Sequence, residues 1–205
     1  MSNLENKINI GTIGAGYWGI NVIRNLYNTD GFVLKTCCDK NPERLKVIKK
    51  LIPLADVTTD YKQILLDKQI QAVYIATPAK SHYKLVKEAL LFDKHVLVEK
   101  PFATSQKEAA ELVKLAKEKN KVLMVGFVFL YNPTVEKVKD LLDNRSNKIL
   151  GKINFIYSTR TSLGPRVRED VNIVWDYAIH DVCVITYILN EFPIAVRCDG
   201  ASYLR

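Results

Sequence analysis

Three side chains suited to proton chemistry occur in two distant segments of the sequence. Lys100 lies in HVLVEKP (95–101), where an apolar run is followed at once by a glutamate–lysine pair and a proline. Asp176 and His180 lie in WDYAIHD, and their i, i+4 spacing predicts that both face the same side of a helix. Such a pair can hold a hydroxyl group, and histidine is suited to accept its proton. On an otherwise apolar helix, however, a histidine is more often an ordinary core residue.

A glycine-rich stretch, GAGYWG (14–19), matches the G-x-G-x-x-G turn. The motif is weak alone, but here it follows an apolar run and opens a helical pattern, as dinucleotide-binding turns do. Gly14 permits the tight turn, Gly16 lets a pyrophosphate approach the backbone, and Gly19 allows close packing of helix on strand. The helix N-terminus supplies N–H donors. The sequence therefore predicts a dinucleotide site here.

The second apolar run ends in Asp39, 20 residues after Gly19 (39 − 19). A carboxylate at this place accepts hydrogen bonds from the adenine ribose hydroxyls and repels a 2′-phosphate. NAD is therefore favoured over NADP, although Lys40 and Arg44 lie nearby and weaken the preference. The alternative is that Asp39 is only a turn residue.

Apolar runs alternate with helical patterns through the first two-thirds of the chain. Thr77 and Pro78 end the third run and are predicted to line the nicotinamide side, although an ordinary strand-ending turn is the alternative. Ser105 and Glu108 form a capping box ahead of the fourth helix. Runs rich in Val and Ile between helices indicate βαβ units and a parallel sheet. We predict strands at 8–14, 32–39, 72–78, 95–101 and 122–129, and helices at 17–28, 42–51, 82–91 and 109–119.

The pattern changes near residue 150. The segment 152–162 alternates like a strand open on one face, 174–189 reads as a helix, and 195–205 begins another strand. A sheet of two strands is rarely stable alone. The predicted fold is α/β, a doubly wound parallel Rossmann sheet over 1–126, followed by the truncated start of an α+β substrate domain over 127–205.

The composition is that of a globular protein with a basic surface. The chain has 30 Lys and Arg against 22 Asp and Glu, a net charge of +8, but the lysines are dispersed along the predicted helices. Nucleic-acid binding would need basic clusters with interleaved aromatics, so we do not expect it. No run approaches the ~18 apolar residues of a membrane span. The four cysteines lack metal-ligand spacing, and we expect buried thiols, no metal and a cytoplasmic location.

Several of these motifs together resemble the Gfo/Idh/MocA oxidoreductases. They are GAGYWG, the Cys-Asp pair at 38–39, ATPAKSHY and, most specifically, HVLVEKP. The resemblance implies that Lys100 lies beside the nicotinamide and the reacting hydroxyl, that Pro101 holds the turn, often through a cis bond, and that Asp176 and His180 form the second catalytic element. Whether Lys100 or His180 is the base stays open. Glu99 would orient Lys100 or a loop. The expected cofactor contacts further include Tyr17, Trp18, His82 and Glu99.

Other stretches resemble members that oxidise the 3-hydroxyl of UDP-N-acetylhexosamines or their uronic acids. They are GYWGINVIRN (16–25), FLYNP (129–133) and 160–176. Arginine suits an anionic nucleotide sugar because guanidinium binds phosphate and carboxylate in bidentate fashion; the alternative is that the loop arginines are merely exposed to solvent. The substrate contacts expected from this resemblance are Tyr131, Asn132, Arg160, Arg166, Arg168 and Asn172.

The expected function is an NAD-dependent dehydrogenase acting on a secondary hydroxyl of a sugar or nucleotide sugar such as a UDP-sugar. The alternative is a non-catalytic NAD(P)-binding sensor or interaction protein of the same fold. Members of the family continue well beyond this end, so we expect either a fragment or a short gene product. We also expect a homo-oligomer that assembles through the second domain.

Overall fold

The computed structural model describes residues 7–143, 153–161 and 170–201. The chain divides into two compact units. Unit 1 contains Met1–Gly126 together with the short segment Arg168–Asn172, and unit 2 contains Phe127–Val167 with Ile173–Arg205.

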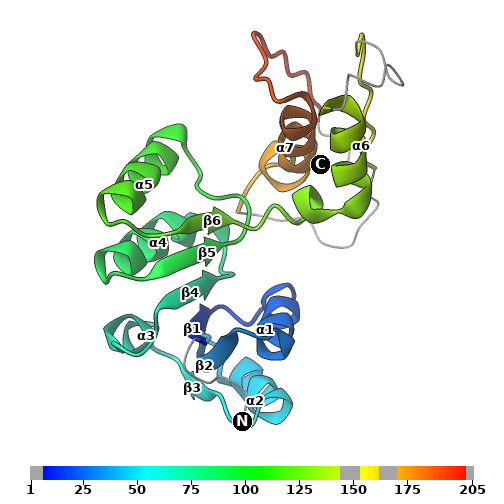
Figure 1. Ribbon diagram of the computed structural model, residues 1–205. Helices are drawn as coiled ribbons and strands as arrows, with labels where there is room; N and C mark the ends of the chain where they lie inside the picture. The colour runs from blue at the N-terminus through cyan, green and yellow to red at the C-terminus, as the bar shows by residue number, and fades with distance from the viewer. Residues whose placement is uncertain (1–6, 144–152, 162–169, 202–205) are drawn as a thin grey trace. The chain divides into compact units, whose positions relative to one another are not determined.

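Unit 1 is built on one parallel sheet of six strands (Figure 1). The strand order is β3-β2-β1-β4-β5-β6, the order of a doubly wound dinucleotide-binding fold, which confirms the predicted fold class. The chain order reverses between β1 and β4, and ligands of such sheets bind at that point. The strands are β1 Ile8–Ile13, β2 Phe32–Cys38, β3 Asp56–Thr58, β4 Ala72–Ile75, β5 His95–Val98 and β6 Leu123–Val125.

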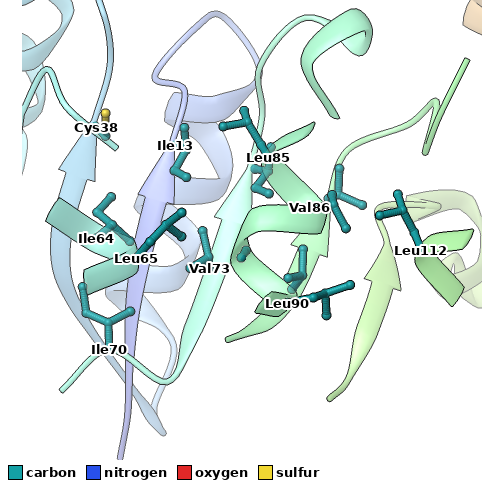
Figure 2. Close-up of a cluster of buried hydrophobic side chains, with 14 of the residues drawn as sticks. Ile13, Cys38, Ile64, Leu65, Ile70, Val73, Leu85, Val86, Leu90 and Leu112 are labelled. Carbon is teal, nitrogen blue, oxygen red and sulfur yellow. The ribbon is translucent and has the colours of Figure 1, made fainter. Parts of the chain in front are cut away.

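Helices cover both faces of this sheet. On one face, side chains of α3, α4 and α5 pack on the strands, and Figure 2 shows one from each helix: Leu65 and Leu90 near Val73, and Leu112 further along the same cluster. On the other face, Ile23 of α1 and Ile48 of α2 form a second core cluster. Strands buried on both faces explain the nearly continuous apolar runs. The helical elements are α1 Gly19–Asn28, α2 Pro42–Leu51, α3 Lys62–Leu66, η2 Ala79–Ser81, α4 His82–Leu91 and α5 Gln106–Glu118.

The six strands of this sheet end in register at their carboxyl edge, beginning with Thr58 of β3, which is paired with Cys38. Ile13, the last residue of β1, is paired with both Cys38 of β2 and Ile75 of β4. Ile75 is paired with Val98, which is in turn paired with Val125. The residues that follow these six strand ends therefore emerge in one row along the edge of the sheet.

The element boundaries differ from the sequence prediction in places. Ser105 does cap α5, because its Oγ accepts from the Glu108 N–H (3.2 Å), but the Glu108 carboxylate reaches back to the N–H of Thr104 (3.3 Å). Strand β6 ends at Val125, whereas the apolar pattern predicted a strand to residue 129. Strand β3 and helix α3, in a segment with little periodicity, were not predicted.

Unit 2 is helical in the residues that the structure describes. A 3-10 turn, η3 (Val128–Tyr131), precedes α6 (Pro133–Asp143), and a wide π turn, η5 (Val174–Ala178), leads into α7 (Ile179–Leu189). Helix α6 packs on α7 (Figure 1). The helix predicted over 174–189 is confirmed, apart from its wide first turn.

The two strands predicted in unit 2 are wrong over the described residues. Segments 153–161 and 191–201 have no regular structure, and a strand forms only where another strand pairs with it. Their apolar side chains are instead exposed: Phe155 is 80% exposed and Ile194 fully exposed. The expectation of buried thiols is also wrong for Cys198, which is exposed, whereas Cys37 and Cys38 are buried.

The described residues lack two further features, a helix able to span a membrane and a cluster of metal ligands. No helix there is long and apolar enough to cross a membrane. Within the same ranges, no three His, Cys, Asp or Glu side chains gather as a metal site would require.

Candidate functional site

The glycine-rich turn joins β1 to α1 at the point where the strand order reverses. Gly14 has φ +101°, a conformation that L side chains rarely adopt, and a Cβ there would collide with the carbonyl oxygen of Ala76. A Cβ on Gly19 would collide with the carbonyl of Gly14. A Cβ on Gly16 would meet no atom closer than the Arg44 Nη1, at 3.9 Å. The turn is therefore tight at its two ends and has open space at Gly16.

Asp39 follows β2 and is almost completely buried against this turn. Its Oδ2 accepts the N–H of Ala15 at 2.7 Å, and its Oδ1 accepts the N–H of Asn41 at 2.8 Å. The guanidinium of Arg44, half exposed on α2, lies 3.4 Å from Oδ2. Asp39 is thus more than a turn residue, because its carboxylate fixes the backbone of the glycine-rich turn. Arg44 places a cation at the same position.

Glu99, which directly follows β5, links three parts of the sheet edge. Its Oε1 accepts two hydrogen bonds of 2.9 Å, from the Trp18 indole Nε1–H and from the Tyr74 hydroxyl. Trp18 belongs to the glycine-rich turn, and Tyr74 is a buried residue of β4. These contacts fit the expected role of orienting a loop, and the backbone N–H and the charge of Lys100 also act on the Glu99 carboxylate.

Burial dominates the electrostatics of this cluster. It raises the pKa of the Glu99 carboxyl above its ordinary value, and the hydrogen bonds from Tyr74 and Trp18 oppose the shift only in part. Burial, together with the Glu99 carboxylate, also raises the pKa of the Tyr74 hydroxyl. Sequence reasoning missed Tyr74. A hydroxyl in an otherwise aliphatic core strand needs a partner, and this was the available signal.

The turns that follow β4 and β5 lie side by side and are joined by one buried histidine. The Lys100–Pro101 bond is cis, as the resemblance suggested. His82, the first residue of α4, has no exposed surface, and its Nε2 lies 2.8 Å from the carbonyl oxygen of Thr77. Its Nδ1 lies 2.8 Å from the carbonyl oxygen of Pro101.

A distant segment is attached to the same turn of unit 1. The N–H of Ala79, directly after the Thr77–Pro78 turn, donates to Asp170 Oδ2 at 3.0 Å. Sequence reasoning did not single out Asp170, because nothing local marks a contact across 91 residues. Asn172, a predicted substrate contact, is exposed at the end of this segment.

In unit 2, His180 lies in a cluster of aromatic and charged groups. The rings of Phe129 and His180 meet edge to face with centroids 4.9 Å apart, and the Arg160 guanidinium lies over the Phe129 ring at 5.1 Å. Asp181 binds Arg160 through two bonds of 2.8 and 3.1 Å and accepts a third from Ser158. Arg160 lowers the pKa of Asp181 and is itself held charged, its pKa being raised.

The remaining predicted residues lie on several different elements. Asp176 lies in the wide turn η5, and His180 lies at the start of α7, into which that turn leads. Tyr131 is exposed, and Asn132 caps α6 by accepting the Thr134 N–H at 2.9 Å. Arg166 and Arg168 lie outside the described residues.

The strand order and the glycine-rich turn at its carboxyl edge are those of a dinucleotide-binding Rossmann fold. The model of the Gfo/Idh/MocA family, an oxidoreductase family with an NAD-binding Rossmann fold, matches residues 8–127. The chain belongs to this family.

Relatives with stated activities act on different substrates. Myo-inositol 2-dehydrogenase of Thermotoga maritima is 26% identical over 94% of this chain and 58% of its own length. Among solved structures, KijD10, a 3-ketoreductase from Actinomadura kijaniata with NADP and TDP-benzene, is 28% identical (TM-score 0.62; 67% of this chain, 42% of that one). GenD2 from gentamicin A biosynthesis, with NAD, shares the fold at 23% identity (TM-score 0.80; 92% and 55%).

The alignments with these relatives cover only part of each relative's length. The chain spans 50–59% of the length of three curated relatives that align with nearly all of it.

Proposed function

We propose that this protein is an NAD-dependent dehydrogenase or reductase that transfers a hydride between the nicotinamide and a secondary hydroxyl of a sugar or nucleotide sugar. The observation that carries the proposal is the row of turns at the carboxyl edge of the sheet. It combines the open space at Gly16, the carboxylate of Asp39 and the Glu99–Lys100–Pro101 turn. The names of the inositol dehydrogenase and the 3-ketoreductase support a ring hydroxyl or ketone as substrate.

The sheet order suggests how the cofactor would lie. The glycine-rich turn after β1 would take the pyrophosphate at the N-terminus of α1. Asp39, on the β2 side, would accept the adenine ribose hydroxyls, so the nicotinamide would fall on the β4 and β5 side. Trp18 and Tyr17, both exposed in the turn, would cover the cofactor. Bound there, the cofactor would accept or supply the hydride.

NAD is proposed over NADP because of Asp39. Its carboxylate is buried against the turn and would repel a 2′-phosphate. Arg44, however, offers a cation 3.4 Å away, and solved relatives hold either cofactor: NADP in KijD10 and NAD in GenD2.

Lys100 and His180 are the proposed proton-transfer residues, with Asp176 as the partner of His180. Removal of a hydride from an alcohol carbon requires that the hydroxyl proton also leave, and an amine or imidazole group can accept it. The Arg160–Asp181 pair beside Phe129 would orient His180 rather than bind substrate. Tyr131, Asn172, Arg166 and Arg168 are kept as proposed substrate contacts.

The deciding experiment has two arms. Binding of NAD(H) and NADP(H) is measured by titration calorimetry, and turnover is followed by NADH fluorescence with a panel of inositols, UDP-sugars and other nucleotide sugars. Binding with turnover on one of these substrate classes supports the proposal. Tight binding with no turnover on any would favour a non-catalytic sensor, and absence of binding would remove the cofactor role altogether.

A further inference from the structure

His82 is a fully buried side chain that takes no part in the proton transfer proposed above. It begins α4, yet both of its ring nitrogens face backbone carbonyls of two other segments along the sheet edge. One carbonyl is that of Thr77, after β4, and the other is that of Pro101, after β5. The ring is thus a bridge between the two turns on one side of the glycine-rich turn.

The chemistry of the ring makes this bridge unusual. Both contacts are 2.8 Å, within hydrogen-bond range, and both partners are acceptors. A neutral imidazole donates from one nitrogen only, whereas the doubly protonated ring donates from both. No other side chain of this size has two nitrogens on opposite sides of a rigid plane. The substitution of a more flexible group with one nitrogen would therefore release one of the two turns.

The position of the two turns indicates which part of the cofactor the His82 bridge affects. Ile75 and Val98, the strand ends that precede them, are paired in register. The turns therefore begin at the same level of the edge, on the β4–β5 side of the strand-order reversal. In a doubly wound sheet whose β2 side takes the adenine ribose, this is the nicotinamide side. The Pro101 carbonyl, moreover, directly follows Lys100 along the chain.

We infer that His82 is a positioning residue for the nicotinamide end of the cofactor. It holds the Thr77 and Pro101 carbonyls, and with them the backbone of Lys100, at a fixed separation. The sequence-based expectation was a direct cofactor contact; a fully buried ring that lies between two carbonyls acts through the turns instead. This inference rests on the proposed cofactor role of the sheet edge. It goes further because it assigns His82 to binding of the nicotinamide part of the cofactor and not to binding of the ADP-ribose part.

The test compares NADH with ADP-ribose, which lacks the nicotinamide ring. In the unaltered protein NADH should bind more tightly than ADP-ribose. His82→Gln and His82→Asn each keep a single donor nitrogen, and each should weaken NADH about tenfold while leaving ADP-ribose within about twofold. His95→Gln is the matched control. His95 lies at the other end of β5 and accepts one hydrogen bond, from the Val122 N–H at 3.0 Å, so this variant should change neither affinity.

A second measurement needs no variant. In ¹⁵N spectra of the unaltered protein, NADH should shift the ring signals of His82, ADP-ribose should not, and neither ligand should shift those of His95. Equal losses for both ligands in the His82 variants would show a purely structural residue and overturn the inference. So would equal affinity of the unaltered protein for the two ligands, or unchanged His82 signals on addition of NADH. Failure of both ligands to bind would instead refute the cofactor role itself.

Discussion

The indole of Trp18 and the carboxylate of Glu99 are joined by a hydrogen bond of 2.9 Å across 81 residues of sequence. The bond connects the glycine-rich turn to the turn that carries Lys100. A movement of one turn therefore strains or breaks its hydrogen bond to the other. The Glu99 carboxylate that accepts this bond is partly buried.

The first prediction concerns the pH dependence of stability. Because burial raises the folded-state pKa of Glu99, its contribution to stability is full at low pH and is lost as pH rises through that raised pKa. Glu99→Gln keeps an oxygen acceptor and has no such proton to lose. Its stability relative to the parent should therefore rise as the pH is raised from about 4 towards 8. Urea unfolding at a series of pH values measures this.

The same substitution at Glu111 is the control. Lys87 lowers the pKa of Glu111, so that carboxylate stabilises the fold above its ordinary pKa and loses this effect as pH falls. Glu111→Gln should therefore become relatively less stable as pH rises, with the opposite sign. If the stability of both variants relative to the parent changed with pH in the same direction, Glu99 would not be a group whose ionisation destabilises the fold.

The second prediction concerns the Tyr74 hydroxyl. Tyr74→Phe removes one of the two donors to Glu99 Oε1 and should lower the free energy of unfolding of unit 1 by about 1–3 kcal/mol, because a partly buried carboxylate is left with less compensation. In the Glu99→Gln background, Tyr74→Phe should lower the free energy of unfolding by less, because a neutral amide loses less than a carboxylate when a hydrogen-bond donor is removed. Strictly additive effects in this double-mutant cycle would rule out the coupling.

The third prediction concerns cofactor choice. We expect NAD(H) to bind at least about tenfold more tightly than NADP(H), or roughly 1.4 kcal/mol. Asp39→Asn should reduce this ratio, because the carboxylate that repels a 2′-phosphate becomes neutral. Arg44→Ala should increase it, because the adjacent cation is removed. Calorimetric titration with both cofactors gives the ratio for each protein. A parent that prefers NADP(H) would show that Arg44 outweighs Asp39.

The fourth prediction concerns proton transfer and rests on the proposed function. Lys100→Ala and His180→Ala should each lower turnover by about a hundredfold or more with NAD affinity nearly unchanged, because general acid–base groups supply roughly 10²–10⁴. Turnover is measured with the best substrate of the panel. Lys80→Ala and His95→Ala are controls of the same residue types and should retain activity. A Lys100 or His180 variant with normal turnover would exclude that residue from the mechanism.

The fifth prediction concerns self-association through unit 2. Apolar side chains of α7 and the segment after it are exposed, among them Val182 (55%), Phe192 (89%) and Ile194. Large apolar surfaces mark interfaces. Light scattering should therefore show association, and Val182→Lys with Phe192→Ser should reduce it. Leu54→Lys, at an equally exposed position of unit 1, should not. A parent that stays monomeric would contradict the expectation.

The sequence predicted the sheet of unit 1 well because its information is local. Five apolar runs with helical patterns between them indicate a parallel sheet, and the G-x-G-x-x-G turn needs no distant partner to be recognised. What sequence reasoning missed depends on contacts between distant segments. Tyr74 and Trp18 meet Glu99 only because strand pairing brings them together, and Asp170 reaches Ala79 across 91 residues.

In unit 2, local sequence patterns led to a wrong prediction. An alternating pattern such as 152–162 predicts a strand on the assumption that another strand will pair with it. Over the described residues 153–161 no such pairing exists, and the same sequence remains irregular. The error arises from extending a local rule beyond its geometric condition.

The in-register ends of the six strands also bear on how such a protein can change. Each turn of the edge starts from the same level of a rigid frame, so a loop can be lengthened or exchanged without shifting the register of the strands, provided that the contacts between turns, such as Trp18–Glu99, are kept. Loss of one residue inside a strand is different. It would draw that loop back by about 3.3 Å and turn the strand's side chains to the opposite face. The frame therefore tolerates variation in the loops and resists it in the strands, which makes the loops the natural place to engineer a new substrate preference.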